Sequence, residues 1–247
     1  MSARPPETAQ APGAQRHGGH ANVQARVDHL VVAAATLQQG IDWCEATLGV
    51  TPGPGGEHPL MGTHNRLLRI ATADYPRAYL EIIAIQLGRE PQRRRRWFDL
   101  DDEPLQAELA RFGPRLIHFV ANVNDAAAAV RNLEWIGIDR GEPVAASRET
   151  ARGLLQWQIT LREDGARLFD GTLPTLIEWG ETHPAPFLPE SGVTLQSLAV
   201  HHPRAAELKT AYQAIGLDNV RIQQGPADLC ATLDTPRGRV TLESRGL

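Results

Sequence analysis

The sequence predicts an α+β protein of repeated β-α-β-β-β modules, two of which form a cup while a third is a degenerate copy. Three observations support this fold class. A short strand with one polar residue among apolar and β-branched residues occurs three times, at 27–33, 116–123 and 195–200. Each copy is followed by a helical segment that ends at a glycine, and each repeat closes with a strand that carries a glutamate.

The repeat can be followed position by position. The polar residues of the first strands are His29, His118 and Ser197. The glycines that end the helices follow after 20, 19 and 19 residues, as Gly49, Gly137 and Gly216. Glycine is common there because it adopts the left-handed conformation that closes a helix. The glutamates of the closing strands are Glu81, Glu178 and Glu243.

The first module and its connector are predicted to span 26–113. Apolar residues recur every three or four positions over 37–48, which predicts a helix with one face on a sheet. Glycine and proline crowd 51–59, which predicts a loop, and strands are expected at 66–71 and 78–85. A polar connector follows at 87–113, with a short helix near 104–112. Its run of four arginines is interpreted as a solvated linker.

The other two modules are predicted to span 114–190 and 191–247. The second has a predicted helix at 125–135, which Asp125 would cap, and strands near 144–147, 154–161 and 175–179. The third has a predicted helix at 204–215 and strands near 220–223, 229–234 and 239–243. Residues 1–25 are rich in Pro, Gly, Ala and Gln and are predicted to be a disordered tail, because they bury too little apolar surface to offset their ordering entropy.

Composition excludes several classes of protein. A chain of 247 residues with 42% hydrophobic and 22% charged residues is typical of a soluble globular protein, and it contains no apolar run of membrane-spanning length. The first residues lack a secretion signal, so a cytoplasmic location is expected. A net charge of −4 argues against a general nucleic-acid binder. Cys44 and Cys230 are too few for a disulfide framework or a thiolate metal site.

The repeat also predicts a metal site. If the first two modules form a half-barrel, the inward residues of their first and last strands converge on one axis. These residues are His29, Glu81, His118 and Glu178. Two imidazoles and two carboxylates suit a divalent ion such as Zn, Ni, Co, Mn or Fe, and an ion preferring six ligands would keep open positions for substrate. The alternative interpretation of each histidine is a hydrogen-bonded core residue.

Several short motifs resemble the vicinal oxygen chelate superfamily, which includes glyoxalase I, extradiol dioxygenases, methylmalonyl-CoA epimerase and bleomycin-resistance proteins. The motifs are Asp28-His29-Leu30, Tyr79-Leu80-Glu81 and their repeats at His118 and Glu178. More narrowly, Gly62-Thr63-His64-Asn65, Gln156-Trp157, Leu176-Ile177-Glu178-Trp179 and His183-Pro184 resemble its glyoxalase-like domain branch. The resemblance implies that all four ligand positions are occupied by competent residues, as in bacterial-type glyoxalase I.

The activity that this resemblance implies is that of a divalent-metal-dependent lyase or isomerase of the glyoxalase I type. Its small oxygenated substrate would chelate the ion, and Glu178 or Glu81 would move a proton. One alternative is a metal-free protein that sequesters a small molecule, as bleomycin-resistance proteins do. Another is an extradiol-dioxygenase-like oxidoreductase, which fits less well because that group uses two histidines and one carboxylate.

Five polar residues are candidates for binding the substrate. Strand alternation over 154–161 puts Gln156 and Gln158 on one face, where they could line the cup, with Trp157 on the other. The remaining candidates, which could hold a carbonyl or carboxylate, are His64, Asn65 and Arg148. Each of the five could instead be a rim or turn residue. The expected partner is a small-molecule substrate, with no nucleic acid and no membrane, and a homodimer is a possible assembly.

The third module is predicted to pack beside the cup and to cover an exposed sheet edge or apolar face, since Ser197 is a poor metal ligand. In the rival arrangement modules two and three pair, and Glu243 joins His118 and Glu178 at the ion.

Overall fold

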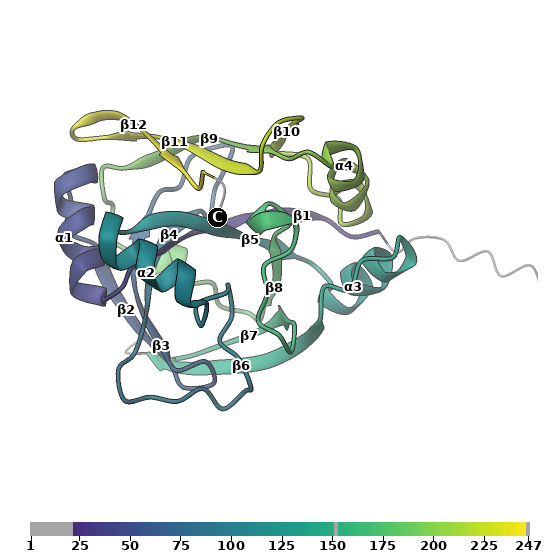
Figure 1. The fold of residues 1–247 in the computed structure, drawn as a ribbon, viewed down its shortest axis with the longest axis horizontal. Coiled ribbons are helices and arrows are strands. Elements are labelled where there is room, and N and C mark those ends of the chain that lie inside the picture. Colours follow the sequence, from purple (N-terminus) through teal and green to yellow (C-terminus); the bar gives the residue numbers. More distant parts are fainter. Residues whose placement is uncertain (1–21, 151–152, 246–247) are drawn as a thin grey trace, which may run out of the picture.

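The computed structural model describes residues 22–150 and 153–245, within which the chain forms twelve strands and four α-helices (Figure 1). The predicted disordered tail falls almost entirely outside these residues. No helix within them is long and apolar enough to cross a membrane.

The first module contains one helix and four strands. They are β1 (Ala25–Ala33), α1 (Leu37–Leu48), β2 (Gly53–His58), β3 (Thr63–Arg69) and β4 (Tyr79–Ile85). Thr36 caps α1 by accepting a hydrogen bond from the Gln39 amide, and Gly49 ends it with a φ of 78°. The predicted loop at 51–59 was wrong over most of its length, because β2 pairs with β3 there.

A connecting helix and the second module follow. The elements are α2 (Glu103–Phe112), β5 (Arg115–Val123), α3 (Ala126–Trp135), β6 (Glu142–Thr150), β7 (Gly153–Leu161) and β8 (Thr175–Trp179), with a 3₁₀ turn at Phe169–Gly171 before β8. The Asp125 side chain accepts a hydrogen bond from the Ala128 amide, which confirms the predicted cap of α3.

Modules one and two form one curled eight-stranded sheet in the order β2-β3-β4-β1-β5-β8-β7-β6. The first strands of the two modules lie side by side and antiparallel, so His29 is opposite Val120 and His118 is opposite Val31. The rival pairing of modules two and three is therefore wrong. The curl brings the two sheet edges together, since the space beside Gly56 on β2 is filled by the guanidinium of Arg148 on β6.

The third part of the chain forms a separate sheet above the outer face of β1 and β5 (Figure 1). Its elements are β9 (Thr194–His201), α4 (Ala205–Ala214), β10 (Arg221–Gln223), β11 (Asp228–Thr235) and β12 (Gly238–Glu243). The element sequence is the predicted one. The strand order, β10-β9-β11-β12, is not that of modules one and two, where the first strand pairs in parallel with the last.

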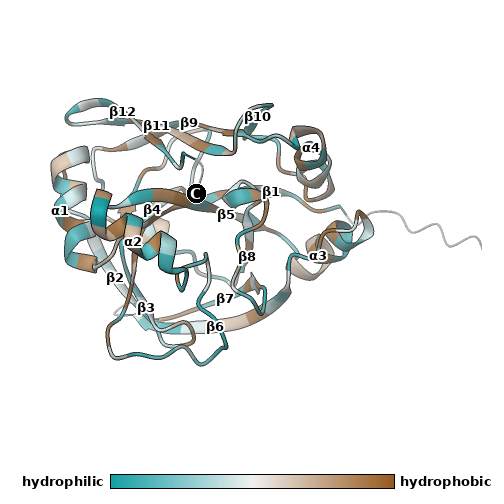
Figure 2. Ribbon diagram, viewed as in Figure 1, coloured by the Kyte–Doolittle hydropathy of each residue, from teal (hydrophilic) through white to brown (hydrophobic). Residues whose placement is uncertain are grey.

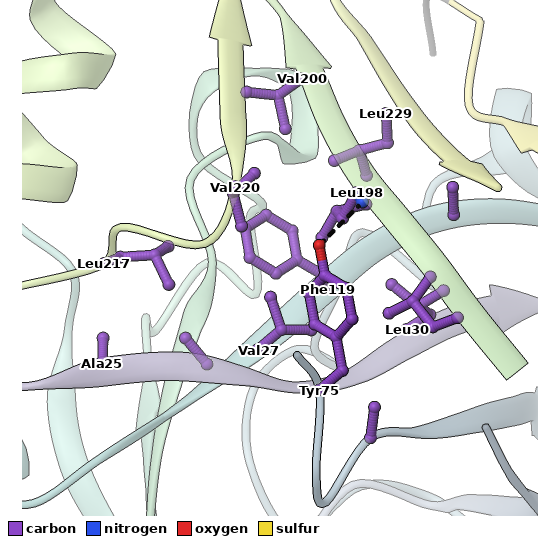
Figure 3. Close-up of a cluster of buried hydrophobic side chains, with 14 of the residues drawn as sticks. Ala25, Val27, Leu30, Tyr75, Phe119, Leu198, Val200, Leu217, Val220 and Leu229 are labelled. Atoms are coloured by element: carbon purple, nitrogen blue, oxygen red, sulfur yellow. Dashed lines mark hydrogen bonds between the residues drawn. The ribbon is translucent and has the colours of Figure 1, made fainter. Parts of the chain in front are cut away.

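The apolar core between the two sheets explains this packing. Hydrophobic stretches occur on the facing strands of both layers (Figure 2). Leu30 and Phe119 from the large sheet meet Leu198 and Leu229 from the small one (Figure 3). The Leu198 amide donates a hydrogen bond to the Tyr75 hydroxyl across the interface, at 3.2 Å. The third unit therefore covers an apolar face, as predicted.

The concave face of the large sheet is filled by the connector. Trp97, Phe98 and Leu100 are buried there against Val31, Ile83, Ile117, Val120, Ile159 and Ile177. The sequence predicted a polar solvated linker in this region. Arg96, the last of the four arginines, is instead held by Asp101 at 2.7 Å.

Candidate functional site

A buried polar cluster lies on the concave face of the first module. Its centre is His29 on β1, with Glu81 on β4 and Asn65 on β3. These positions face inward because they alternate with Leu30, Leu80 and Leu68, which belong to the outer core. A register irregularity between Val27 and His29 lets Asp28 lie beside His29 on the same side.

Asp28 is fully enclosed and accepts three hydrogen bonds. The donors are His29 Nδ1 at 2.6 Å, His183 Nε2 at 2.9 Å and Trp179 Nε1 at 3.0 Å. Burial acts to raise the pKa of the Asp28 carboxyl, but the hydrogen bonds from His183 and His29 outweigh it and hold the pKa well below its ordinary range. Asp28 is therefore a fixed negative charge.

His29 lies between two carboxylates. Its Nδ1 bonds Asp28, and its Nε2 is 3.5 Å from Glu81 Oε2, longer than an ordinary N–H···O hydrogen bond. Burial acts to lower the pKa of His29, but Asp28 and Glu81 raise it to about 9. The ring stacks on Tyr79 with centroids 4.5 Å apart. At neutral pH the site therefore holds an imidazolium whose Nε2 faces a carboxylate.

Glu81 is held from its other side. Asn65 Nδ2 donates to Glu81 Oε1 at 2.6 Å and also lies 3.2 Å from His58 Nε2. Despite its burial, the pKa of Glu81 falls to about 2 because of His29 and its other partners. Burial lowers the pKa of His58 to about 4. His58 is therefore neutral, with Nδ1 donating to Thr63 Oγ1 at 3.0 Å.

His118 faces the same side of the sheet as Val31 but makes structural contacts. Its Nδ1 donates to the Gly171 carbonyl at 2.8 Å, and its Nε2 accepts from the amide and hydroxyl of Thr175 at 3.1 and 3.0 Å. Burial, together with the positive charge of Arg140, holds the pKa of His118 well below its ordinary value. Phe98 packs against the His118 ring, with centroids 5.2 Å apart.

Glu178 lies on the opposite face of β8. Its neighbour Ile177 belongs to the concave core, while Glu178 Oε2 accepts a hydrogen bond from the Ala126 amide at the start of α3, at 2.7 Å. The structure therefore brings His29 and Glu81 together and places His118 and Glu178 among other partners.

The other substrate candidates divide between the two faces. Gln156 and Gln158 are exposed and border a shallow depression of about 270 Å³ that also includes Glu178. The expectation that they line the cup was reversed, because Trp157 and Ile159 point inward instead. His64 is next to Asn65 on β3 but does not line the inner cavity, and burial lowers its pKa. Asn65 and Arg148 do line it.

The polar cluster forms the floor of a small inner cavity of about 40 Å³, room for little more than one water-sized group. An outer groove of about 700 Å³ adjoins it and runs between β2 and the β6–β7 hairpin. Arg148, Leu67 and Pro184 line both spaces. A small head group could therefore reach His29 and Glu81 while the remainder of the molecule lies in the groove.

Sequence reasoning missed four residues of this site. They are Asp28, His58, Trp179 and His183. Asp28, Trp179 and His183 lay within the motifs that carried the family resemblance, but their roles depend on contacts across more than 150 residues. His58 fell in the stretch interpreted as a loop.

A family model described as a glyoxalase-like domain matches residues 27–216, most of the chain. The chain belongs to the glyoxalase-like domain family. This result confirms the resemblance to the vicinal oxygen chelate superfamily. No protein of curated function matches the sequence.

Solved structures support the fold of this glyoxalase-like protein. A hypothetical protein from Staphylococcus aureus is 14% identical over 82% of this chain and 87% of its own, with a TM-score of 0.56. A methylmalonyl-CoA epimerase from Streptomyces coelicolor in complex with 2-nitronate-propionyl-CoA matches less well, at 18% identity over 66% and 99% of the two chains and a TM-score of 0.38. The epimerase from Mycobacterium tuberculosis gives 17% identity over 62% and 85%, with a TM-score of 0.34.

The four predicted metal ligands of this glyoxalase-like protein do not fit one ion in this structure. Both ring nitrogens of His118 are engaged, and Glu178 lies on the other face of the sheet. Among residues 22–150 and 153–245, no three His, Cys, Asp or Glu side chains are arranged to hold a metal. His29 Nε2 and Glu81 Oε2 are the two predicted donor atoms that remain close to each other.

Proposed function

We propose that this protein is an enzyme of the isomerase or lyase type that moves a proton on a small oxygenated substrate. The observation that carries the proposal is the buried pair of His29 Nε2 and Glu81 Oε2, 3.5 Å apart at the floor of a cavity with access to a groove. A protonated imidazole and an ionised carboxylate at one point supply the acid and the base that such a reaction needs together.

The chemistry follows from these two groups. In the proposed reaction Glu81 takes a proton from a carbon next to a carbonyl, and His29 Nε2 gives its proton to the carbonyl oxygen. Return of a proton to a different carbon gives an isomer, and loss of a leaving group gives a lyase product. Asp28 would hold the His29 ring in place and stabilise its charge, and Asn65 would orient the Glu81 carboxylate.

The proposed substrate carries an anionic or carbonyl group within reach of Arg148. This guanidinium forms no hydrogen bond or ion pair within the described part of the chain, although it lines both the cavity and the groove. Arginine binds carboxylates and phosphates through paired donors. Since the cavity is small, the reacting carbon and its oxygen would occupy it, and the rest of the molecule would extend past Arg148.

In the metal-dependent form of this proposal, the divalent ion of the Zn, Ni, Co, Mn or Fe type sits at His29 and Glu81. Asp28 and Glu81 together carry one more negative charge than His29, which favours a cation, and a carboxylate behind a histidine is a common support for metal ligands. When bound, such an ion would polarise a substrate oxygen.

Metal analysis tests this form. Protein purified without added metal and incubated with each ion should take up one equivalent, Glu81→Gln should lose it, and Glu178→Gln should keep it. No uptake by the wild type would contradict the metal-dependent form. Loss of uptake in the Glu178 variant would restore the four-ligand set.

Proton exchange tests the enzyme proposal. Lactate, mandelate and pyruvate in D₂O, followed by NMR, serve as substrates that have a C–H beside an oxygenated carbon. Exchange should fall by about 10²-fold or more in Glu81→Gln and His29→Gln, as expected for loss of a general acid or base. Glu178→Gln is the matched control on the opposite sheet face and should retain activity.

A second candidate is a metal-free protein that sequesters a small molecule, supported by the apolar lining of the groove by Leu155, Phe187 and Leu188. A compound that raises the melting temperature but shows no exchange would favour it. The extradiol-dioxygenase alternative loses support, because it would need His118 at the ion beside His29.

A further inference from the structure

The connector between the first two modules supplies a wall of the inner cavity. Trp97 and Phe98 both line it, opposite the strands that carry His29 and Glu81. The Trp97 ring packs edge-on against His58 and lies flat on Phe98, with centroids 5.0 Å away in each case. The β-α-β-β-β modules do not contain this segment, so the connector closes a cavity that they leave open.

The side chain of Trp97 contains an unsatisfied donor. The residue is 7% exposed, and its Nε1 is buried with no hydrogen-bond partner among the described residues. Trp179 lines the same cavity, but its Nε1 donates to Asp28 at 3.0 Å. A buried N–H without an acceptor is costly, and buried indoles usually have a partner. The missing acceptor is therefore expected to come from outside the protein.

We infer that the Trp97 indole N–H donates a hydrogen bond to an oxygen of the bound ligand, and that Trp97 and Arg148 together select a carboxylate head group. The inference rests on the proposed function, since it concerns the substrate of the same cavity. The two side chains line one cavity, and neither has a hydrogen-bond partner among the described residues. A carboxylate has two oxygens and only accepts hydrogen bonds, so it can satisfy both.

The groove determines the remainder of this ligand. Beyond Arg148 its lining is mainly apolar and includes Pro54, Leu155, Phe187 and Leu188. The ligand class is therefore a small carboxylic acid with an apolar body, such as an aryl-substituted acid. A water molecule at Trp97 would satisfy the same N–H in the free protein, and the carboxylate would displace it.

Phenylacetate, acetate and 2-phenylethanol are suitable probes for the full chain, because they combine head and body, head alone, and body alone. Phenylacetate should bind most tightly by calorimetry. In ¹⁵N-labelled protein, which contains five tryptophans, the Trp97 indole signal is the one lost in Trp97→Phe, and phenylacetate should shift it saturably. Trp97→Phe should bind phenylacetate about tenfold or more weakly, the usual effect of losing a hydrogen bond to a charged group.

Two matched variants separate the outcomes. Trp135→Phe removes an indole that is 72% exposed on α3 and should leave the affinity unchanged. Arg148→Gln should weaken phenylacetate binding. If Trp97→Phe keeps its melting temperature and wild-type affinity while Arg148→Gln weakens binding, the role of Trp97 is overturned and the proposed function stands.

The remaining outcomes are also decisive. If wild-type protein does not bind phenylacetate, the carboxylate site is overturned, and proton exchange at Glu81 then decides the proposed function separately. If Trp97→Phe fails to fold, the shift of the wild-type indole signal still decides: a saturable shift of one of the four signals not lost in the other tryptophan variants supports the inference, and its absence overturns it.

Discussion

His29 and His118 occupy equivalent places in two copies of one module, yet the structure gives them opposite charges. The strands β1 and β5 pair about a local two-fold axis, with His29 opposite Val120 and His118 opposite Val31. His29 has Asp28 and Glu81 beside it, and its pKa rises to about 9. His118 has Thr175, the Gly171 carbonyl and the charge of Arg140 nearby, and its pKa falls well below the ordinary value.

The strand register explains the difference. Within module one, Glu81 on β4 is opposite Val31, two residues beyond His29. Within module two, Val120, two residues beyond His118, is opposite Thr175. Thr175, rather than Glu178, is therefore the structural equivalent of Glu81. The comparison teaches that a repeated histidine becomes a chemical group or a structural one according to a single residue on the neighbouring strand.

The largest expected effect is on stability at Asp28. Asp28→Ala should lower the free energy of unfolding by about 3–5 kcal/mol, because it leaves the buried His29 with one carboxylate and three donors without an acceptor. Urea unfolding measures this change. Glu178→Ala, which removes a carboxylate that accepts from the start of α3, should cost about 1 kcal/mol. Equal losses in the two variants would break the comparison.

The pH dependence of stability should have opposite signs at the two histidines. The pKa of His29 is about 9 in the folded protein and about 6.5 when unfolded, so its contribution is complete below pH 6.5 and is lost as pH rises through 9. This contribution amounts to about 3 kcal/mol, and the difference between wild type and His29→Gln should shrink accordingly between pH 6.5 and 9.5. Unfolding in urea across this range measures it.

His118 should show the reverse pattern. Its folded state resists protonation, so the stability of the wild type relative to His118→Gln should fall as pH drops below about 6.5. NMR titration of the ring protons gives an independent check, with His29 changing near pH 9 and His118 remaining neutral. A His118 signal that titrates near 6.5 would contradict the structural role.

A smaller effect is expected at Thr175. Its hydroxyl donates to His118 Nε2 and accepts a hydrogen bond from Arg140, a guanidinium that is only 2% exposed. Thr175→Val should lower the free energy of unfolding by about 2 kcal/mol, because Arg140 loses a buried acceptor. Thermal and urea unfolding measure it. A neutral outcome would show that Pro174, whose carbonyl accepts from Arg140 Nε, is sufficient.

The smallest effects are expected on the outer face of the second module. Gln156→Ala and Gln158→Ala should each change the free energy of unfolding by less than about 0.5 kcal/mol and should leave ligand binding unchanged, because both side chains are exposed and lie away from the cavity. Calorimetry with phenylacetate provides the measurement. Weaker binding in either variant would place the ligand site on the other face of the sheet.

The sequence by itself determined the repeat, the order of the elements and the superfamily. Strand alternation, the apolar stripe of 37–48 and the glycine after each helix are local properties, and local chemistry decides them. The same local information identified His29, Glu81, Asn65 and Arg148 as candidates. It also gave the cap at Asp125.

Only the tertiary structure decided which candidates meet. The glutamate of the closing strand recurs in sequence at Glu178, but strand pairing puts Thr175 at the site, and an offset of three residues turns a side chain to the opposite face. The hydrogen bonds of Asp28 to Trp179 and His183 join residues more than 150 positions apart. The burial of Trp97 is likewise a long-range result, because a polar connector gains an apolar role only when two curled half-sheets offer it an unfilled concave face.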